Sequence, residues 1–178
     1  MDAIEVPERV VLLDEHGAPV GSQLKSVVHT TDTPLHLAFS CHVLNAAGQV
    51  LVTRRALGKR TWPGVWTNSF CGHPQPGEPM VDAVVRRAQD EVGLTLRELR
   101  PVLPEFRYRA TDASGIVENE VCPVYLAVAD TEPRLNPDEV MDARWAEAGA
   151  LGAALRATPW AFSPWFVSQA RDMSLYAG

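Results

Sequence analysis

The chain has 178 residues, 46% of them hydrophobic, so it can bury the core of one domain without disulfide or metal staples. Its net charge of −6 at pH 7 excludes a general attraction to nucleic acid or anionic lipid, so an anion site would need a local cluster of Lys and Arg. The odd number of cysteines, the lack of a signal-peptide pattern and the lack of an apolar run of roughly 20 residues predict a cytoplasmic protein with reduced thiols and no membrane partner.

Two antiparallel strand pairs are predicted in the first third of the chain. Residues 8–24 (ERVVLLDEHGAPVGSQL) are typical of a strand, a polar turn at Gly17 and an extended return. Residues 35–56 predict two longer strands joined by the short loop 45–48, a hairpin.

The clearest helix follows the turn-rich stretch 59–77, in which only residues 67–71 predict a short strand. Pro79 suits the first turn of this helix, and Gly93 suits the position just past its end. The apolar residues between them repeat at helical spacing and predict one buried stripe: Val81, Val84, Val85, Ala88 and Val92.

Strands and two further helices are predicted in the remainder. Residues 105–110, 115–129 and 142–147 are typical of strands, with Pro123 at an edge or a bulge because it has no amide hydrogen for a ladder. Residues 148–157 and 164–174 predict helices. The predicted elements are mostly strands, with one central helix and two helices near the C-terminus. This composition indicates an α+β fold with mixed sheets.

Candidate metal ligands are scattered along the chain. His29, His36 and His73 are far apart in sequence, whereas Glu118 and Glu120 are two apart on a predicted strand and therefore share one face. A lone histidine, or a Glu-x-Glu pair, is more often an ordinary surface feature. The sequence pattern alone does not show that the five residues meet.

The central helix carries a second candidate group. Arg87 and Glu91 are four residues apart, so they lie on one flank of the helix, either as an ordinary ion pair or as an anion contact beside a ligand for a hard cation such as Mg²⁺. Further basic residues that could clamp a phosphate group are Lys25, Arg54, Arg55, Lys59 and Arg60, the last four of which are concentrated in residues 53–60 (TRRALGKR). The alternative is a solubilising loop.

A known sequence pattern connects these features. The series Gly72, Glu78, Arg86, Glu91 and Gly93 resembles the Nudix box, with Arg87 and Asp90 where Nudix hydrolases carry glutamate. Longer segments, including HTTDTPLHLAFS, RTWPGVWTNSFCGHPQPGE, FRYRATDASGIVENEVCPV and ATPWAFSPW, look like the type I isopentenyl-diphosphate Δ-isomerases of the Nudix superfamily. The resemblance implies one Nudix-type isomerase domain over residues 1–178, with a central box helix and an N-terminal extension, 1–35, that contributes ligands.

The resemblance also implies roles for single residues. The proton-transfer residues would be Cys71, Glu120 and Tyr108. The metal ligands would be His29, His36, His73, Glu118 and Glu120, holding Mn²⁺ or Zn²⁺, with Glu91 binding the Mg²⁺ of the substrate diphosphate. The substrate would contact Lys25, Arg55, Lys59, Arg87 and Trp165. No flavin is implied, and the partner would be a small molecule, isopentenyl or dimethylallyl diphosphate, bound by a monomer or weak dimer.

The implied reaction moves a double bond, which needs an acid and a base on the two sides of a dry hydrocarbon. Cys71 and Glu120 would be that pair, and the indole of Trp165 would stabilise a tertiary carbocation between the two proton transfers. One alternative is a Nudix hydrolase, which predicts the intact box that is absent here. Another is a non-catalytic metal-binding domain, which gives no reason for a cysteine, two same-face glutamates and a basic cluster to occur together.

Overall fold

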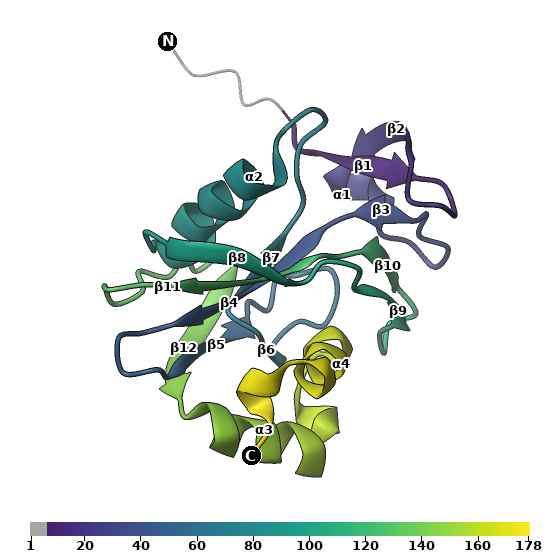
Figure 1. Cartoon of the computed structure of the whole chain (residues 1–178). Helices are drawn as coiled ribbons and strands as arrows, with labels where there is room; N and C mark the ends of the chain where they lie inside the picture. The colour runs from purple at the N-terminus through teal and green to yellow at the C-terminus, as the bar shows by residue number, and fades with distance from the viewer. Residues whose placement is uncertain (1–6) are drawn as a thin grey trace.

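Two mixed sheets and a small number of helices form the structure, a computed structural model that describes residues 7–178 (Figure 1). The α+β class is confirmed. Residues 1–6, the start of the expected extension 1–35, lie outside the described residues. The first sheet has five strands, in the order β2 (Pro19–Leu24), β1 (Arg9–Leu13), β3 (His36–Leu37), β10 (Val117–Val121) and β9 (Arg107–Thr111).

The second sheet has seven strands and forms the centre of the fold. Its main path runs β12 (Val140–Ala146), β5 (Val50–Arg55), β4 (Phe39–Leu44), β11 (Val124–Val128) and β8 (Arg97–Leu103). Two short strands lie off this path: β6 (Trp66–Thr67) pairs with β5, and β7 (Phe70–Gly72) pairs with β4. The predicted 45–48 loop therefore does join two paired strands, while the single strand expected at 67–71 is two separate short ones.

Helices cover both faces of the seven-stranded sheet. Helix α2 (Met80–Arg87) packs on one face, and α3 (Ala148–Ala157) and α4 (Pro164–Asp172) lie on the other (Figure 1). A short helix, α1 (Lys25–Val28), precedes His29, and 3-10 turns occupy Pro159–Ala161 and Ser174–Tyr176. Among residues 7–178, every helix is too short or too polar to cross a bilayer.

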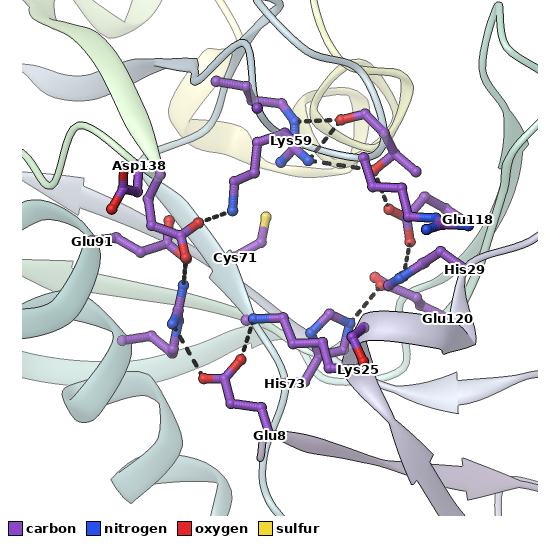
Figure 2. Close-up of a pocket in the computed structure, with 18 of the residues that line it drawn as sticks. Glu8, Lys25, His29, Lys59, Cys71, His73, Glu91, Glu118, Glu120 and Asp138 are labelled. Atoms are coloured by element: carbon purple, nitrogen blue, oxygen red, sulfur yellow. Dashed lines mark hydrogen bonds and ion pairs between the residues drawn. The ribbon is translucent and has the colours of Figure 1, made fainter. Parts of the chain in front are cut away.

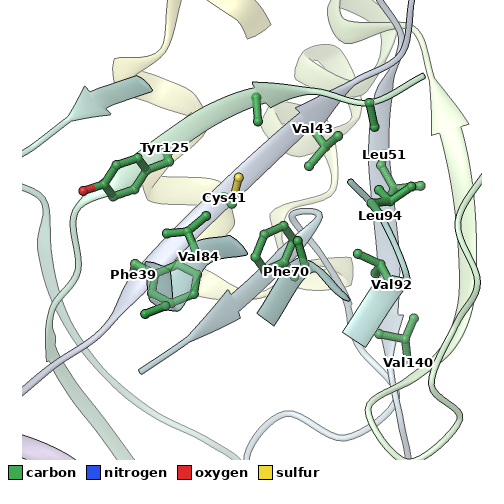
Figure 3. Packing of buried hydrophobic residues seen from close by; sticks show 14 residues of the cluster. Phe39, Cys41, Val43, Leu51, Phe70, Val84, Val92, Leu94, Tyr125 and Val140 are labelled. Carbon is green, nitrogen blue, oxygen red and sulfur yellow. The ribbon is translucent and has the colours of Figure 1, made fainter. Parts of the chain in front are cut away.

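Strand β4 is buried on both faces, so its alternating side chains build two different environments. Phe39, Cys41 and Val43 belong to the apolar core under α2 (Figure 3). Ser40 and His42 point to the opposite side, where α4 packs. One face of the strand is thus purely apolar, and the other carries polar groups.

The chain changes sheet at two neighbouring points. Ala38 separates β3 from β4, and Cys122 with Pro123 separates β10 from β11. The two crossings are bonded to each other, because the amide of Ala38 donates to Val121 O at 2.9 Å and that of Ser40 donates to Pro123 O at 3.1 Å. The continuous strand predicted from residue 35 is therefore wrong. Pro123 lies where the chain leaves one sheet for the other, rather than at an edge or within a bulge.

The apolar stripe predicted for the central helix is partly wrong, since Val81 and Val85 are exposed. The buried side of the helical segment also includes Arg87 and Glu91, the charged residues predicted on the flank of the helix. Residues 88–92 form a π-helical turn, a local widening that often marks functional sites. Gly93 ends it with φ +62°, and a Cβ there would lie 2.8 Å from Arg134 O, so glycine is required.

Candidate active site

A cavity of about 820 Å³ opens where the two sheets and α2 meet (Figure 2). It is lined by all but one of the thirteen residues to which the sequence resemblance assigns a role. The exception is His36, which is completely buried and lies next to the lining residues His29, His73 and Glu120 rather than in the cavity wall. Residues as far apart in the sequence as Lys25 and Trp165 are therefore brought to one place.

The three histidines and Glu120 form one cluster. One ligand atom from each of His29, His36, His73 and Glu120 lies within 4.8 Å of the others. Glu118 adjoins this cluster, with its Oε2 3.0 Å from His29 Nε2. All five predicted ligands of the histidine site are thus brought together, and Glu118 and Glu120 do share a face of β10.

The donor chemistry of this cluster fits a divalent cation. His29 Nε2, His36 Nε2 and Glu118 Oε2 are buried and, although each ring nitrogen lies near a carboxylate oxygen, none of the three makes a hydrogen bond of acceptable geometry with the described residues, which is costly unless something else binds them. His36 Nδ1 donates to Pro34 O at 2.9 Å, which fixes the ring and directs Nε2 toward the cluster.

The protonation states of His36, His73 and Glu120 are set by their burial and by the contacts between the two rings and the Glu120 carboxylate. Burial lowers the pKa of His73 to about 3, so this ring is neutral, the form that binds metal. Burial would raise the pKa of Glu120, but His36 and His73 outweigh it and hold this pKa well below its usual value. Burial likewise opposes a charge on His36, yet the hydrogen bond and the negative charge of Glu120 outweigh it and raise the His36 pKa.

Cys71 and Glu120 come from different sheets, β7 and β10, and both line the cavity. Figure 2 shows the Cys71 thiol pointing into the space that the site residues enclose. Burial raises the pKa of Cys71 to about 11, so its thiol is protonated at neutral pH. Tyr108 donates its hydroxyl to Glu120 Oε2 at 2.9 Å, and burial raises the Tyr108 pKa, which keeps it a donor.

The predicted basic residues gather at another part of the wall, where carboxylates hold them. Lys25 Nζ lies 2.6 Å from Glu8 Oε2, and Arg87 Nη2 lies 3.1 Å from Glu139 Oε1. Arg87 also bonds Glu91, and Lys59 bonds Glu139. Burial lowers the pKa of Lys59 to about 8. Glu8 and Glu139 were not predicted, because a single surface-type glutamate has no distinguishing pattern.

Arg55 and Trp165 form the border between the charged and the apolar walls. Arg55 Nη2 donates to Thr61 O at 2.8 Å, and its guanidinium carbon lies 5.3 Å from the centroid of the Trp165 ring. Trp165 is 2% exposed, and its Nε1 donates to Asn68 Oδ1 at 3.0 Å. Asn68 was also missed, although its oxygen contacts both Trp165 and, at 3.4 Å, Cys71 Sγ.

Two further residues of the sequence box support the loop that carries His73. Arg86 makes a forked pair with Glu78, at 2.8 and 2.9 Å, and also donates to His73 O at 3.2 Å. Glu78 in turn accepts the amide of Gln75 at 2.7 Å. Glu78 and Arg86 of the box therefore have a structural use here, independent of metal binding.

Comparisons with known proteins agree with the sequence resemblance. The NUDIX domain family matches residues 34–166. A relative from Agromyces mediolanus, named isopentenyl-diphosphate Delta-isomerase, is 63% identical over 171 residues, covering 96% of this chain and 83% of its own. A relative of the same name from Kocuria rhizophila is 60% identical over 175 residues, covering 98% and 97%, and one from Citrobacter koseri is 59% identical over 165 residues, covering 93% and 91%.

Solved structures show the fold. A Deinococcus radiodurans protein superposes with a TM-score of 0.71 at 22% identity, covering 92% of this chain and 98% of its own. A MutT NUDIX hydrolase from Burkholderia pseudomallei superposes with a TM-score of 0.59 at 23% identity, covering 79% and 98%. At these identities the likeness concerns the architecture alone.

Proposed function

The chain belongs to the isopentenyl-diphosphate Delta-isomerase family of the Nudix superfamily, and we propose that it moves the double bond of isopentenyl diphosphate by proton transfer between Cys71 and Glu120. The product is dimethylallyl diphosphate, formed when a proton adds to one carbon and another leaves from a second. The main observation in support of this proposal is that the protonated thiol of Cys71 and the ionised carboxylate of Glu120, which come from two different sheets, line one cavity.

The protonation states suit an acid and a base. The Cys71 thiol, with its pKa of about 11, can give a proton, and the Glu120 carboxylate can take one. Tyr108, bonded to Glu120 Oε2, can pass a proton to or from that carboxylate. Because the reaction is reversible, the acid and the base exchange roles with its direction.

Protonation of the alkene leaves a tertiary carbocation, which must not meet water. Trp165 forms an apolar wall with Tyr108, whose ring centroid lies 5.7 Å away. The Arg55 guanidinium beside the indole supports the view that this ring attracts positive charge. We assign carbocation stabilisation to the indole of Trp165.

Binding of the diphosphate falls to the basic wall. Lys25, Arg55, Lys59 and Arg87 would contact its oxygens, which for Lys25, Lys59 and Arg87 would replace contacts that carboxylates now make. Glu91 would hold Mg²⁺, and the cluster His29, His36, His73, Glu118 and Glu120 would hold Mn²⁺ or Zn²⁺. These cations, when bound, would neutralise diphosphate charge and keep the Glu120 carboxylate and its neighbours in fixed positions.

The hydrolase alternative lacks support at the box. Arg87, in the place of a hydrolase glutamate, is buried against Glu91 and Glu139. A non-catalytic domain would leave the thiol and the basic wall without a purpose. Incubation with isopentenyl diphosphate and Mg²⁺ in D₂O, followed by NMR, separates the three. Deuterated dimethylallyl diphosphate supports the isomerase, released phosphate supports a hydrolase, and an unchanged substrate supports the third.

A further inference from the structure

A row of buried polar side chains leads from the Cys71 thiol away from the cavity. Ser40 on β4 faces Cys71 on β7 directly in the strand register, and its Oγ lies 3.3 Å from Cys71 Sγ. Behind Ser40 come Gln169 of α4, whose Nε2 lies 2.9 Å from Ser40 Oγ, and His42, whose Nε2 lies 2.9 Å from Gln169 Oε1. The row ends at Tyr176, whose hydroxyl lies 2.5 Å from His42 Nδ1.

These polar groups are unusual for their surroundings. Ser40, His42 and Gln169 are 0% exposed and Tyr176 is 1% exposed, and the ring of Phe166, part of an apolar cluster, packs 5.6 Å from that of His42 and 5.7 Å from that of Tyr176. A buried amide and a buried imidazole are tolerated only when both are hydrogen-bonded, and apolar side chains of similar shape could fill this face of β4 without that requirement. The row therefore needs a reason beyond packing.

Hydrogen-bond accounting gives the row one direction. Among the described residues, the Tyr176 hydroxyl contacts only His42, and burial raises the Tyr176 pKa, so its buried proton must go to His42 Nδ1. Burial lowers the pKa of His42 to about 4, so the ring is neutral and carries its one proton on Nε2, donated to Gln169 Oε1. Gln169 must then present its NH₂ group to Ser40 Oγ.

The same accounting assigns the protons near sulfur. Ser40 Oγ touches two thiols, Cys71 at 3.3 Å and Cys122 at 3.4 Å. In the described part of the chain Cys122 has Ser40 as its one partner, and the arrangement that satisfies every group has the Cys122 S–H donating to the second lone pair of Oγ. The Ser40 proton is left for Cys71 Sγ. The Cys71 proton, not needed by Ser40, faces Asn68 Oδ1 and the cavity.

We propose that Ser40 is a positioning residue that the Tyr176–His42–Gln169 row locks as a hydrogen-bond donor to Cys71 Sγ. This inference rests on the proposed function, because it requires Cys71 to exchange a proton with the substrate. The Ser40 hydroxyl directs the Cys71 S–H away from the protein interior, and it remains bonded to sulfur after that proton has moved to the alkene. The donor is aligned before the reaction, since each group behind it has its hydrogen bonds fixed.

The direction in which the hydrogen bonds of the row run can be tested by NMR, without an activity assay. In ¹⁵N-labelled wild-type protein, two-bond ¹H–¹⁵N correlations distinguish a protonated from an unprotonated imidazole nitrogen, and a His42→Gln variant identifies the signals of His42. The expected result at pH 7 is a neutral ring with the proton on Nε2. A proton on Nδ1 would reverse every donor in the row and overturn the proposal.

The contribution to the reaction is tested with a matched pair of serine variants. Ser40→Ala should lower kcat by about tenfold to a hundredfold with KM within about twofold of wild type, because the missing donor acts on the reacting sulfur. Ser69→Ala is the control. Ser69 is equally buried, but it bonds Val43 N and Leu51 O at 2.8 and 2.7 Å rather than sulfur, so its loss should reduce stability and leave kcat unchanged.

The outcomes of these experiments distinguish a failure of the proposed role of Ser40 from a failure of the proposed isomerase function. An active wild type in which Cys71→Ala is inactive but Ser40→Ala keeps full kcat would refute the role of Ser40 alone. A wild type that formed no dimethylallyl diphosphate would refute the proposed function first. If Ser40→Ala did not fold, the protonation state of His42 in the wild type would still decide the direction of the row.

Discussion

Lowering the pH from 7 to 4.5 should destabilise this protein through His42. The ring is fully buried, and its two nitrogens are bonded to neutral groups, the Tyr176 hydroxyl and the Gln169 amide oxygen. No carboxylate within the described residues is bonded to it, so a charge gained by the ring would lose its hydration without gaining a counter-ion. Burial lowers the pKa of His42 from 6.5 to about 4 in the folded state.

The size of the effect follows from that shift. A histidine with a lowered folded pKa contributes fully to stability above its unfolded pKa, and the contribution is lost as the pH falls from 6.5 through about 4. A shift of about 2.5 units corresponds to roughly 3 kcal/mol in total, of which about 2 kcal/mol is lost between pH 7 and pH 4.5.

Urea unfolding at pH 7 and pH 4.5 measures this loss. Other groups titrate over the same range, so the comparison is between wild type and His42→Gln, which has no titrating group at this position. The wild type should lose about 2 kcal/mol more than the variant between the two pH values. Equal losses in the two proteins would show that the ring is not held neutral by burial.

Four other predictions concern the candidate site. Cys71→Ala should lower kcat by about 10²- to 10⁴-fold in a product-formation assay, whereas Cys41→Ala, in the core away from the cavity, should keep kcat; near-normal turnover of Cys71→Ala would refute the acid–base assignment. Glu91→Gln should move the Mg²⁺ titration of activity to higher concentration, and unchanged curves would remove this residue from the metal site. Mn²⁺ at about a hundred times its Kd should stabilise the wild type by about 2.7 kcal/mol in thermal unfolding, and His36→Ala should abolish this gain. Trp165→Leu should lower kcat by roughly 30-fold, the equivalent of about 2 kcal/mol of carbocation stabilisation, with little change in KM.

The sequence predicted the parts of this fold that depend on local pattern. The hairpin loop 45–48 and the helix at 148–157 are where turn residues and helical spacing placed them. The shared face of Glu118 and Glu120 followed from the period of a strand. Strand β8 was missed because it is largely exposed, carries Arg and Glu, and contains Pro101, which is unfavourable in a ladder.

Long-range placement could not be predicted in the same way. Val81 and Val85 of α2 were predicted to be core residues because they are apolar and fit the helical spacing. The buried side of the helical segment includes the charged residues Arg87 and Glu91 instead, and these face inward because they line the cavity. Ser40 and Gln169 are 129 residues apart and each has an ordinary sequence context. Their contact depends on how α4 packs against β4, which no local pattern encodes. The resemblance to a family gathered the ligands of the site, but not the groups behind Cys71.

The two crossings between the sheets have a mechanical consequence. Cys71 belongs to the seven-stranded sheet and Glu120 to the five-stranded one, and the sheets share covalent continuity at Ala38 and at Cys122–Pro123. The separation of thiol and carboxylate is therefore an inter-sheet spacing. A tilt of one sheet relative to the other would change this spacing directly. In the proposed reaction this spacing is the distance over which a proton is carried across the substrate, so the angle between the two sheets sets the reach of the acid and the base.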